Sequence, residues 1–272
     1  MNNIKLVMID LDGTVLVDHK RITKQTEKMI DKLIEMQVEV VPATGRHLNS
    51  IPDYFLNHKG INYIVSSGGS LISNGKEDLF VKNIDKEMVD YILKKSEGNV
   101  DHGFVATNKG IIATGSQDVM ITGDDDDFVE KMKKDLFLVD SIYDHVKLNN
   151  LDVKKIYFDF TDLSKRNELH GYFSSYDQIN TVSSMDSNIE ITSKDASKGI
   201  ALHYLKDHLN IKTEEVLAIG DSENDISMLI EAGIGVAMGN ASDEVKAVSD
   251  IVTRSLAEDG FYHAIKKVFK LN

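Results

Sequence analysis

The first part of the chain alternates short apolar runs with amphipathic stretches. Residues 4–9 are mostly apolar and rich in Ile and Val, a pattern that predicts a buried strand. Thr23 can then cap a helix that runs to about Met36 and places its apolar side chains on one face. The pattern predicts two further strands in this region, at residues 38–41 and 61–65, and one further helix at residues 47–57.

The same alternation returns in the last third of the chain. The predicted strands are residues 216–219, 235–238 and 251–252, and the predicted helices are residues 197–209, 225–232, 242–248 and 257–269. Strands that alternate with helices at both ends of a chain are typical of a parallel sheet with helices on both faces. We therefore predict an α/β fold with a Rossmann-like parallel sheet.

The middle of the chain, from about Leu79 to Met185, has a different pattern. Its strand-like runs are residues 103–107, 111–114, 119–121 and 155–160, and its helical runs are residues 86–95, 128–134 and 163–172. Runs of strands with interspersed helices are typical of an α+β module. We predict an inserted α+β domain at residues 79–185, within a core domain made of residues 1–78 and 186–272.

Composition narrows the class of protein. The chain has 272 residues, which at roughly 100–200 residues per domain suits one large or two modest domains. It has no cysteine, so disulfides, thiolate metal sites and thiol nucleophiles are excluded. No run approaches ~20 apolar residues and the N-terminus lacks the apolar stretch of a signal peptide, so we expect a cytoplasmic protein. The net charge of −13 disfavours nucleic acids and anionic membranes as partners.

Two carboxylates, Asp10 and Asp12, follow the first predicted strand and are followed by Gly13. In open parallel sheets, ligands bind beyond the carboxyl ends of the strands. Two such carboxylates can share a divalent cation, or divide the roles of nucleophile and general acid/base. For this motif alone, a solvated turn is the favoured alternative.

Three other polar motifs are each weak when taken alone. Asp221 and Asp225 follow a predicted strand and can complete a set of oxygen ligands, although acidic residues also stabilise a helix start. Thr44 and Gly45 can form a small phosphate cradle, or an ordinary helix cap. Lys198 lies in the first turn of a predicted helix, where a cation is disfavoured unless it neutralises carboxylates or a phosphate. A surface lysine is the alternative.

Together, these motifs resemble the haloacid dehalogenase superfamily, and within it the Cof-type phosphatases with a class IIB cap. The resemblance lies in their order along the chain: residues 10–14 (DLDGT), 44–46 (TGR), 197–199 (SKG) and 220–225 (GDSEND), with further similarity at 237–241 and 258–260. Proteins of this type carry a large cap between the second and third motifs, where residues 79–185 lie here. Residues 67–70 (SGGS) differ from the Ser-Asn-Gly-Ala-like turn that is frequent in the family.

The resemblance implies a role for each matching residue. Asp10 would be the nucleophile that forms an aspartyl-phosphate, and Asp12 would be the general acid and base. Mg²⁺ would be held by Asp10, by the main-chain carbonyl of Asp12 and by Asp221. Asp225 would orient Lys198 or a metal-bound water. The remaining implied role is phosphate binding, by Leu11, Thr44, Gly45, Lys198 and Asn224.

The predicted function is therefore Mg²⁺-dependent hydrolysis of small phosphate monoesters, such as sugar phosphates or phosphorylated cofactors. The expected partner is a small phosphorylated metabolite, and a homo-oligomer is left open. Two alternatives remain: a phosphomutase with the same nucleophile, and a catalytically silent ligand-binding or regulatory protein on the same fold. The acidic run at residues 124–127 is interpreted as the start of a helix rather than as a metal site.

Overall fold

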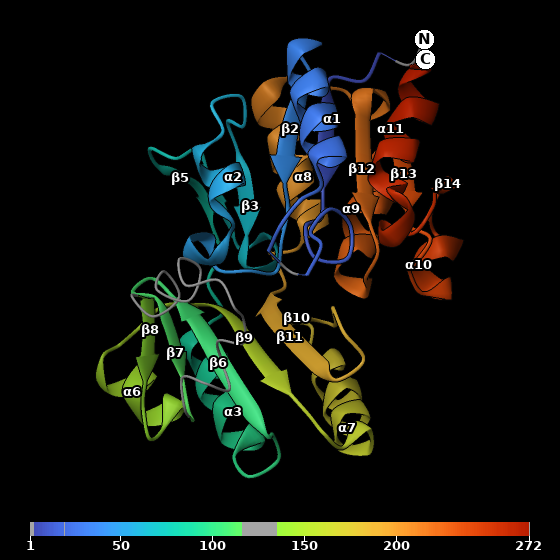
Figure 1. Cartoon of the computed structure of the whole chain (residues 1–272). Coiled ribbons are helices and arrows are strands. Elements are labelled where there is room, and N and C mark those ends of the chain that lie inside the picture. The colour runs from blue at the N-terminus through green and yellow to red at the C-terminus, as the bar shows by residue number, and fades with distance from the viewer. Residues whose placement is uncertain (1–2, 19, 116–134, 272) are drawn as a thin grey trace. The chain divides into compact units, whose positions relative to one another are not determined.

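The computed structural model describes residues 3–18, 20–115 and 135–271 and divides the chain into two units (Figure 1). Unit 1 comprises Met1–Thr44, Pro52–Phe80 and Ser197–Asn272. Unit 2 comprises Gly45–Ile51 and Val81–Ala196. The sequence elements expected at residues 119–121 and 128–134, and the acidic run at 124–127, lie outside the described residues.

Unit 1 contains a five-stranded parallel sheet in the order β14-β13-β12-β1-β2. Its strands are β1 (Leu6–Ile9), β2 (Glu39–Pro42), β12 (Val216–Gly220), β13 (Ile234–Ala237) and β14 (Ile251–Val252). Ile9 pairs with both Pro42 and Ile219, so the carboxyl ends of β12, β1 and β2 meet at one edge. This sheet confirms the predicted α/β fold and places the residues that follow β1, β2 and β12 together.

Helices cover both faces of this sheet. They are α1 (Lys24–Glu35), α2 (Asp53–Asn57), α8 (Lys198–Leu209), α9 (Ile226–Glu231), α10 (Asp243–Ala247) and α11 (Gly260–Phe269). Helix α1 packs against α11 and helix α8 against α9, and Figure 1 shows α1 and α8 on opposite sides of the sheet. Leu6 and Met8 of β1 share one buried cluster with Leu202 and Leu205 of α8. These apolar side chains hold β1 at the centre of the unit.

The single helix predicted for residues 47–57 is wrong. The structure has a 3₁₀ turn at Leu48–Ser50 and then the short helix α2, which begins after Pro52. Proline disfavours the helical conformation in the residue before it, and Ile51 is extended, with φ −81° and ψ 137°. Pro52 therefore separates the two helical pieces.

A second, three-stranded sheet in unit 1 has the order β3-β4-β5, with β3 at Ile64–Ser66, β4 at Leu71–Ser73 and β5 at Asp78–Val81. A single parallel bridge from Ala43 to Val65 connects β3 to the end of β2. The tight turn at Ser67–Gly69 joins the antiparallel strands β3 and β4. This turn lies at the same edge as the carboxyl end of β2.

Unit 2 is an α+β module built on a six-stranded sheet in the order β10-β11-β9-β6-β7-β8. The strands are β6 (His102–Thr107), β7 (Ile111–Ala113), β8 (Leu136–Leu138), β9 (Val153–Asp159), β10 (Ile179–Val182) and β11 (Asn188–Ser193); the helices are α3 (Lys86–Ser96), α6 (Ile142–Leu148) and α7 (Leu163–Ser174). Strand β11 pairs with β9 and β10, so the border between units falls after it rather than at residues 185–186.

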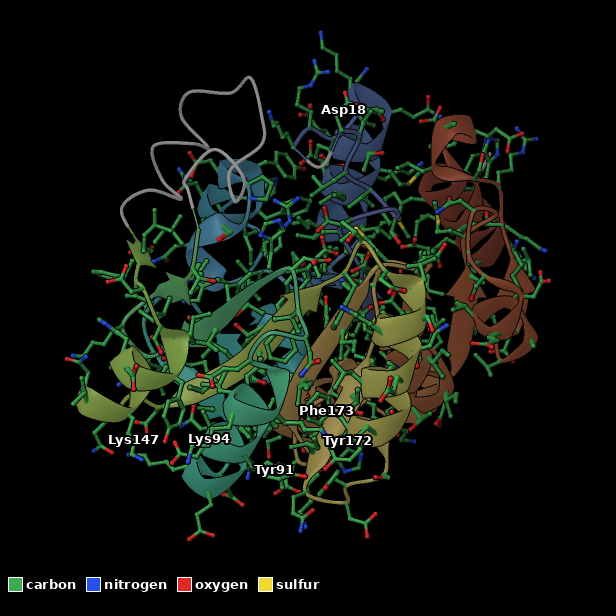
Figure 2. The ribbon with its side chains drawn as sticks, turned by 90° about the horizontal axis from the view of Figure 1, so that it is seen from below. Asp18, Tyr91, Lys94, Lys147, Tyr172 and Phe173 are labelled. Atoms are coloured by element: carbon green, nitrogen blue, oxygen red, sulfur yellow. The ribbon has the colours of Figure 1, made fainter. Side chains whose placement is uncertain are left out.

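The helices of unit 2 share one apolar cluster with its central strands. Ile92 of α3 and Phe173 of α7 are fully buried in this cluster with Ile156 of β9. At the surface, Figure 2 shows Tyr91 and Tyr172 close together, and their hydroxyl groups are hydrogen bonded. Among the described residues, no helix of either unit is long and apolar enough to cross a membrane.

Candidate active site

Asp10 follows β1 directly and is nearly buried, with 5% of its surface exposed. Its main-chain N–H donates to the carbonyl of Ile219, which ties it to the end of β12. Its Oδ1 atom accepts a hydrogen bond from Nζ of Lys198 at 2.6 Å, whereas its buried Oδ2 atom has no hydrogen-bond partner among the described residues. Burial and the nearby carboxylates of Asp225, Asp221 and Asp12 raise the pKa of Asp10 well above its usual range, and Lys198 opposes this shift.

Lys198 is the first residue of α8, and its side chain is fully buried between two carboxylates. Its Nζ atom lies 2.6 Å from Asp10 and 2.5 Å from Asp225. Burial alone would lower the pKa of Lys198, but the charges and hydrogen bonds of the two carboxylates outweigh it and raise the pKa above its ordinary value. The lysine therefore stays charged at neutral pH and neutralises part of the acidic cluster.

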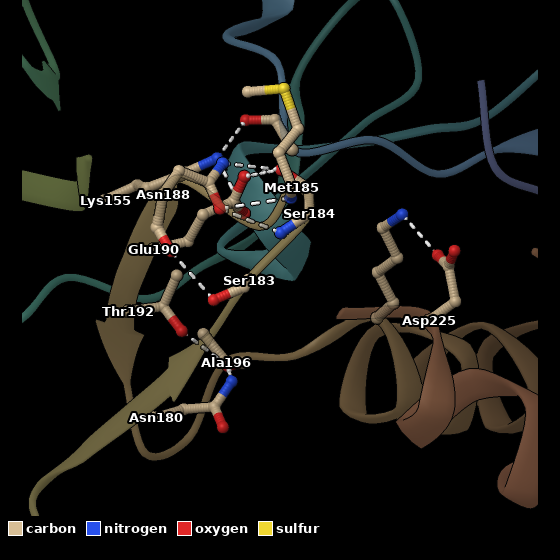
Figure 3. Close-up of polar contacts among 12 residues, drawn as sticks. Lys155, Asn180, Ser183, Ser184, Met185, Asn188, Glu190, Thr192, Ala196 and Asp225 are labelled. Atoms are coloured by element: carbon tan, nitrogen blue, oxygen red, sulfur yellow. Dashed lines mark hydrogen bonds and ion pairs between the residues drawn. The ribbon is translucent and has the colours of Figure 1, made fainter. Parts of the chain in front are cut away.

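Asp225 holds the turn that follows β12. Its Oδ2 atom accepts hydrogen bonds from the main-chain N–H groups of Asp221 and Ser222 at 2.9 and 3.0 Å. Its Oδ1 atom accepts from Lys198, an ion pair that Figure 3 marks with a dashed line. Because both carboxylate oxygens are engaged, this side chain positions the turn and the lysine.

Asp221 lies at the carboxyl end of β12, and three side chains donate hydrogen bonds to it. Thr14 donates to its Oδ1 atom at 3.0 Å, while Ser222 and Asn240 donate to its Oδ2 atom at 3.3 and 3.4 Å. Burial and the charge of Asp225 raise the pKa of Asp221 to about 6. This carboxylate is thus held in place but is easier to protonate than an exposed aspartate.

Gly13 lets the turn after β1 approach Asp221. Its φ is +82°, and a Cβ atom at this position would lie 2.3 Å from Oδ2 of Asp221. The carbonyl of Leu11 accepts the N–H groups of Thr14, Val15 and Leu16, so the turn is tight. A residue with a side chain at position 13 would be strained and would displace the carboxylate.

The carboxylates of Asp10, Asp221 and Asp225 can present oxygen atoms within 4.8 Å of one another. Asp225 is buried and accepts hydrogen bonds from the charged Lys198 and from two main-chain N–H groups, whereas Asp221 is partly exposed and accepts from neutral side chains, so Asp10 and Asp221 are the residues better suited to hold a cation. The unpartnered Oδ2 atom of Asp10 is a further oxygen donor in this cluster. Oxygen ligands of this kind fit a hard divalent cation such as Mg²⁺.

Thr44 follows β2 and is buried at the same edge of the sheet. Its N–H donates to the carbonyl of Val65, and its carbonyl accepts from the N–H of Gly68. Gly69 has φ +95°, and a Cβ atom there would lie 2.2 Å from the carbonyl of Ser197. The turn at residues 67–69 thus contacts both Thr44 and the start of α8, and Gly69 is required for that approach.

The structure therefore brings together, within unit 1, most of the residues that the sequence singled out. Hydrogen bonds and charges join Asp10, Lys198, Asp221 and Asp225, and the charge of Asp12 also raises the pKa of Asp10. The remaining predicted phosphate ligands of unit 1 are largely buried at the carboxyl ends of β1, β2 and β12: Leu11, Thr44 and Asn224. Gly45 is grouped with unit 2.

Thr14 and Asn240 lie within the sequence motifs, but the sequence implied no role for either residue. Asn240 donates to the carbonyl of Gly13 at 3.0 Å and accepts the N–H of Leu256 at 2.8 Å. It therefore ties the turn after β1 to the C-terminal part of the chain. A short polar residue that interrupts a glycine-containing turn after a strand is the only signal for this contact in the sequence.

Unit 2 contains a buried ion pair that the sequence pattern did not reveal. Lys155 of β9 lies 2.9 Å from Glu190 of β11, with 3% and 4% of their side chains exposed, and Figure 3 shows this contact. Lys155 also donates to the carbonyl of Gly45 at 2.8 Å, and Ser184 donates to Glu190 at 2.7 Å. Both charged residues lie in strands that mix polar and apolar positions, where nothing in the hydrophobic pattern marks them as partners.

A buried lysine between two aspartates, beside a further carboxylate at the carboxyl edge of a parallel sheet, suits chemistry on phosphate groups. The sequence matches the haloacid dehalogenase-like hydrolases over residues 7–265, and the chain belongs to this family. It is 30% identical to 5-amino-6-(5-phospho-D-ribitylamino)uracil phosphatase YcsE of Bacillus subtilis, over 97% of this chain and 95% of that protein. It is also 30% identical to phosphatase YwpJ of Bacillus subtilis, over 96% and 99% of the two chains.

Solved structures agree with this assignment. A haloacid dehalogenase-like hydrolase from B. subtilis matches with a TM-score of 0.85 and 29% identity, over 97% of this chain and 99% of that chain. A HAD subclass IIB sugar phosphatase shares the fold, with a TM-score of 0.81, 24% identity and coverage of 97% and 99%. The family and the named relatives identify the chain as a phosphatase enzyme.

Proposed function

We propose that this enzyme is a Mg²⁺-dependent, Cof-type phosphatase that hydrolyses small phosphate monoesters through an aspartyl-phosphate at Asp10. The observation that carries the proposal is the state of the Asp10 carboxylate. Lys198 fixes its Oδ1 atom, while its Oδ2 atom is buried and accepts no hydrogen bond from the residues that the structure describes. A carboxylate held in this way has an oxygen whose lone pairs are free for attack or for a cation.

In the proposed reaction, the Asp10 carboxylate attacks phosphorus and the bond from phosphorus to the alcohol oxygen breaks. Asp12 donates a proton to that oxygen, so the alcohol leaves in neutral form. Asp12 then accepts a proton from water as the water attacks the phosphorus of the aspartyl-phosphate. This second step releases inorganic phosphate and restores the Asp10 carboxylate.

Charge neutralisation is a main requirement of phosphoryl transfer. The whole chain carries −13, so the site needs local positive charge. A divalent cation held by Asp10, the main-chain carbonyl of Asp12 and Asp221 supplies positive charge when bound. Lys198 supplies the second cation, and Asp225 orients it. The proposed phosphate ligands are the groups implied by the motifs: Leu11, Thr44, Gly45, Lys198 and Asn224.

For the substrate, we propose sugar phosphates or phosphorylated cofactors and their precursors. YcsE is named for 5-amino-6-(5-phospho-D-ribitylamino)uracil, so this compound belongs in the first substrate panel. We further propose that unit 2, which contains most of the insertion predicted at residues 79–185, acts as the cap that selects the substrate. We also propose that the enzyme works in the cytoplasm on a small metabolite, without nucleic acid or membrane partners. The number of copies in its assembly is left open.

The test is phosphate release from a panel of monoesters, with Mg²⁺ and with EDTA. We expect Mg²⁺-dependent release that Asp10→Asn lowers by at least about 10³-fold. The matched control is Asp18→Asn, the same change at an exposed residue outside the site, which should leave release unchanged. Release that persists in Asp10→Asn would overturn the assigned nucleophile. Turnover that requires a bisphosphate activator would instead support the phosphomutase.

A further inference from the structure

A hollow of about 510 Å³ lies between α1 and α11, the two helices that stand side by side in Figure 1. Four lysines line it: Lys24, Lys28, Lys32 and Lys266. Its other lining residues are uncharged, and none of the described residues that form it is acidic. Its volume falls in the range of about 300–1,000 Å³ that is usual for small-ligand sites. We call this feature the lysine hollow.

Helix α1 supplies three of the four lysines of the hollow. Lys24, Lys28 and Lys32 are spaced four residues apart, so they share one face of the helix. Glu27 and Asp31 lie beside this row of lysines; Asp31 pairs with His58 at 3.0 Å, and both carboxylates raise the pKa of Tyr54. None of the three acidic residues of α1, which include Glu35, is among the residues that line the lysine hollow.

Within the part of the chain that the structure describes, none of the four lysines forms an ion pair with a carboxylate. Lys24 also lies in the first turn of α1, where the helix dipole disfavours a cation. Like charges four residues apart on a helix repel each other. Repulsion between the lysines lowers the stability of α1 unless an anion binds to them. The row of lysines stands out in a chain whose net charge is −13.

We propose that the lysine hollow binds a small ligand that carries a chain of two or more phosphates. Lysine ammonium groups bind phosphate as point charges, and several of them suit an extended anion better than a single phosphate. Tyr262 of α11 also lines the hollow, with Nζ of Lys266 5.6 Å from its ring centroid. This aromatic ring gives a flat surface beside the cations. The site is separate from Asp10, so it does not depend on the proposed reaction.

The probe is inorganic tripolyphosphate, titrated calorimetrically into the whole chain in EDTA, so that no divalent cation occupies the carboxylate cluster. We expect one binding event, weakened about tenfold or more by Lys28→Gln/Lys32→Gln and by Lys266→Gln. The matched control is Lys267→Gln, which removes the same charge from the next, exposed residue of α11. This control should change the affinity by less than about twofold.

Two results would overturn the proposal. One is the absence of binding; the other is an equal loss of affinity in Lys267→Gln, which would show that net charge alone attracts the anion. A parallel titration with ATP identifies the source of the phosphates. Tighter binding of ATP that is lost in Tyr262→Leu indicates a nucleotide, and equal binding indicates that the phosphate chain alone is recognised.

Discussion

Nζ of Lys198 lies 2.6 Å from Oδ1 of Asp10, and both side chains are buried. With Asp225 on its other side, this lysine is a single cation between two carboxylates inside the protein. Such an arrangement is costly to disrupt, because removal of one partner leaves uncompensated buried charge. The contact therefore links the chemistry of the site to the stability of unit 1.

Lys198→Met should lower the free energy of unfolding by about 3–5 kcal/mol at pH 8 and abolish phosphate release. The loss of stability should be smaller at pH 5, because the pKa of Asp10 is raised by burial and by nearby carboxylates, and protonation of Asp10 removes part of the repulsion in the cluster. Denaturant unfolding at both pH values measures this. Lys206→Met is the control, since Lys206 is also a buried lysine, paired with Glu231 away from the site. It should lose stability but keep its activity, and equal loss of activity in both variants would contradict the role of Lys198.

Because the pKa of Asp221 is about 6, we expect the free energy of unfolding of the metal-free enzyme to fall as the pH rises. An ordinary aspartate has a pKa of 3.8, so between these values the folded protein binds the proton more tightly than the unfolded chain. The stability contributed by this proton is complete below pH 3.8 and is lost as the pH rises through 6. The free energy of unfolding that is lost between low and high pH amounts to about 3 kcal/mol.

In EDTA at pH 8, Asp221→Asn should therefore be more stable than the wild type by up to about 3 kcal/mol, and the two should converge near pH 4. Addition of Mg²⁺ should stabilise the wild type and not the variant. Unfolding curves across this pH range, with and without metal, measure both effects. A gap between wild type and variant that is the same at pH 4 and pH 8 would contradict the shifted pKa.

A comparison of Gly13→Ala with Gly75→Ala should separate the effect of backbone strain from the effect of displacing Asp221. Gly75 has a similar φ of +78° but no atom within 4 Å of a Cβ placed there. Gly75→Ala should cost about 1–2 kcal/mol of stability and leave phosphate release unchanged. Gly13→Ala should cost at least as much and also weaken Mg²⁺ binding, because its Cβ collides with Oδ2 of Asp221. Calorimetry with Mg²⁺ tests this, and equal metal affinity in both variants would be evidence against it.

The buried ion pair of unit 2 gives a prediction about stability alone. Lys155→Met leaves Glu190 buried without its cation and should cost about 3–5 kcal/mol. Lys155→Met/Glu190→Leu removes both charges and should recover much of that loss. Thermal unfolding of the single and double variants measures the coupling. A double variant that is as unstable as the sum of the two single variants would show that the pair is not coupled.

The sequence predicted the fold of unit 1 well because its strands are short, apolar and regularly spaced. The runs at 4–9 and 216–219 became the neighbouring strands β1 and β12, which is why Asp10 and Asp221 could be placed at one edge. The helix over 47–57 failed because Pro52 interrupts a pattern that otherwise reads as helical. Local chain geometry overrode hydrophobic periodicity at that point.

Two long-range contacts could not be predicted from the sequence. Lys155 and Glu190 are 35 positions apart, and the pairing of β9 with β11 brings them together. The contact of Asn240 with Gly13 depends in the same way on the order of strands in the parallel sheet. The roles of Leu11, Thr44, Gly45 and Asn224 toward phosphate remain predictions.

The position of β1 has a consequence for the growing chain during synthesis. Leu6–Ile9 is fully buried, and one of its two edges pairs with β12, which is made about 210 residues later. Until that strand emerges from the ribosome, an apolar strand has one open row of hydrogen-bonding groups, and such edges promote aggregation. A fragment that ends before Val216 should therefore depend on chaperones or precipitate, whereas the complete chain closes this edge with its own sequence.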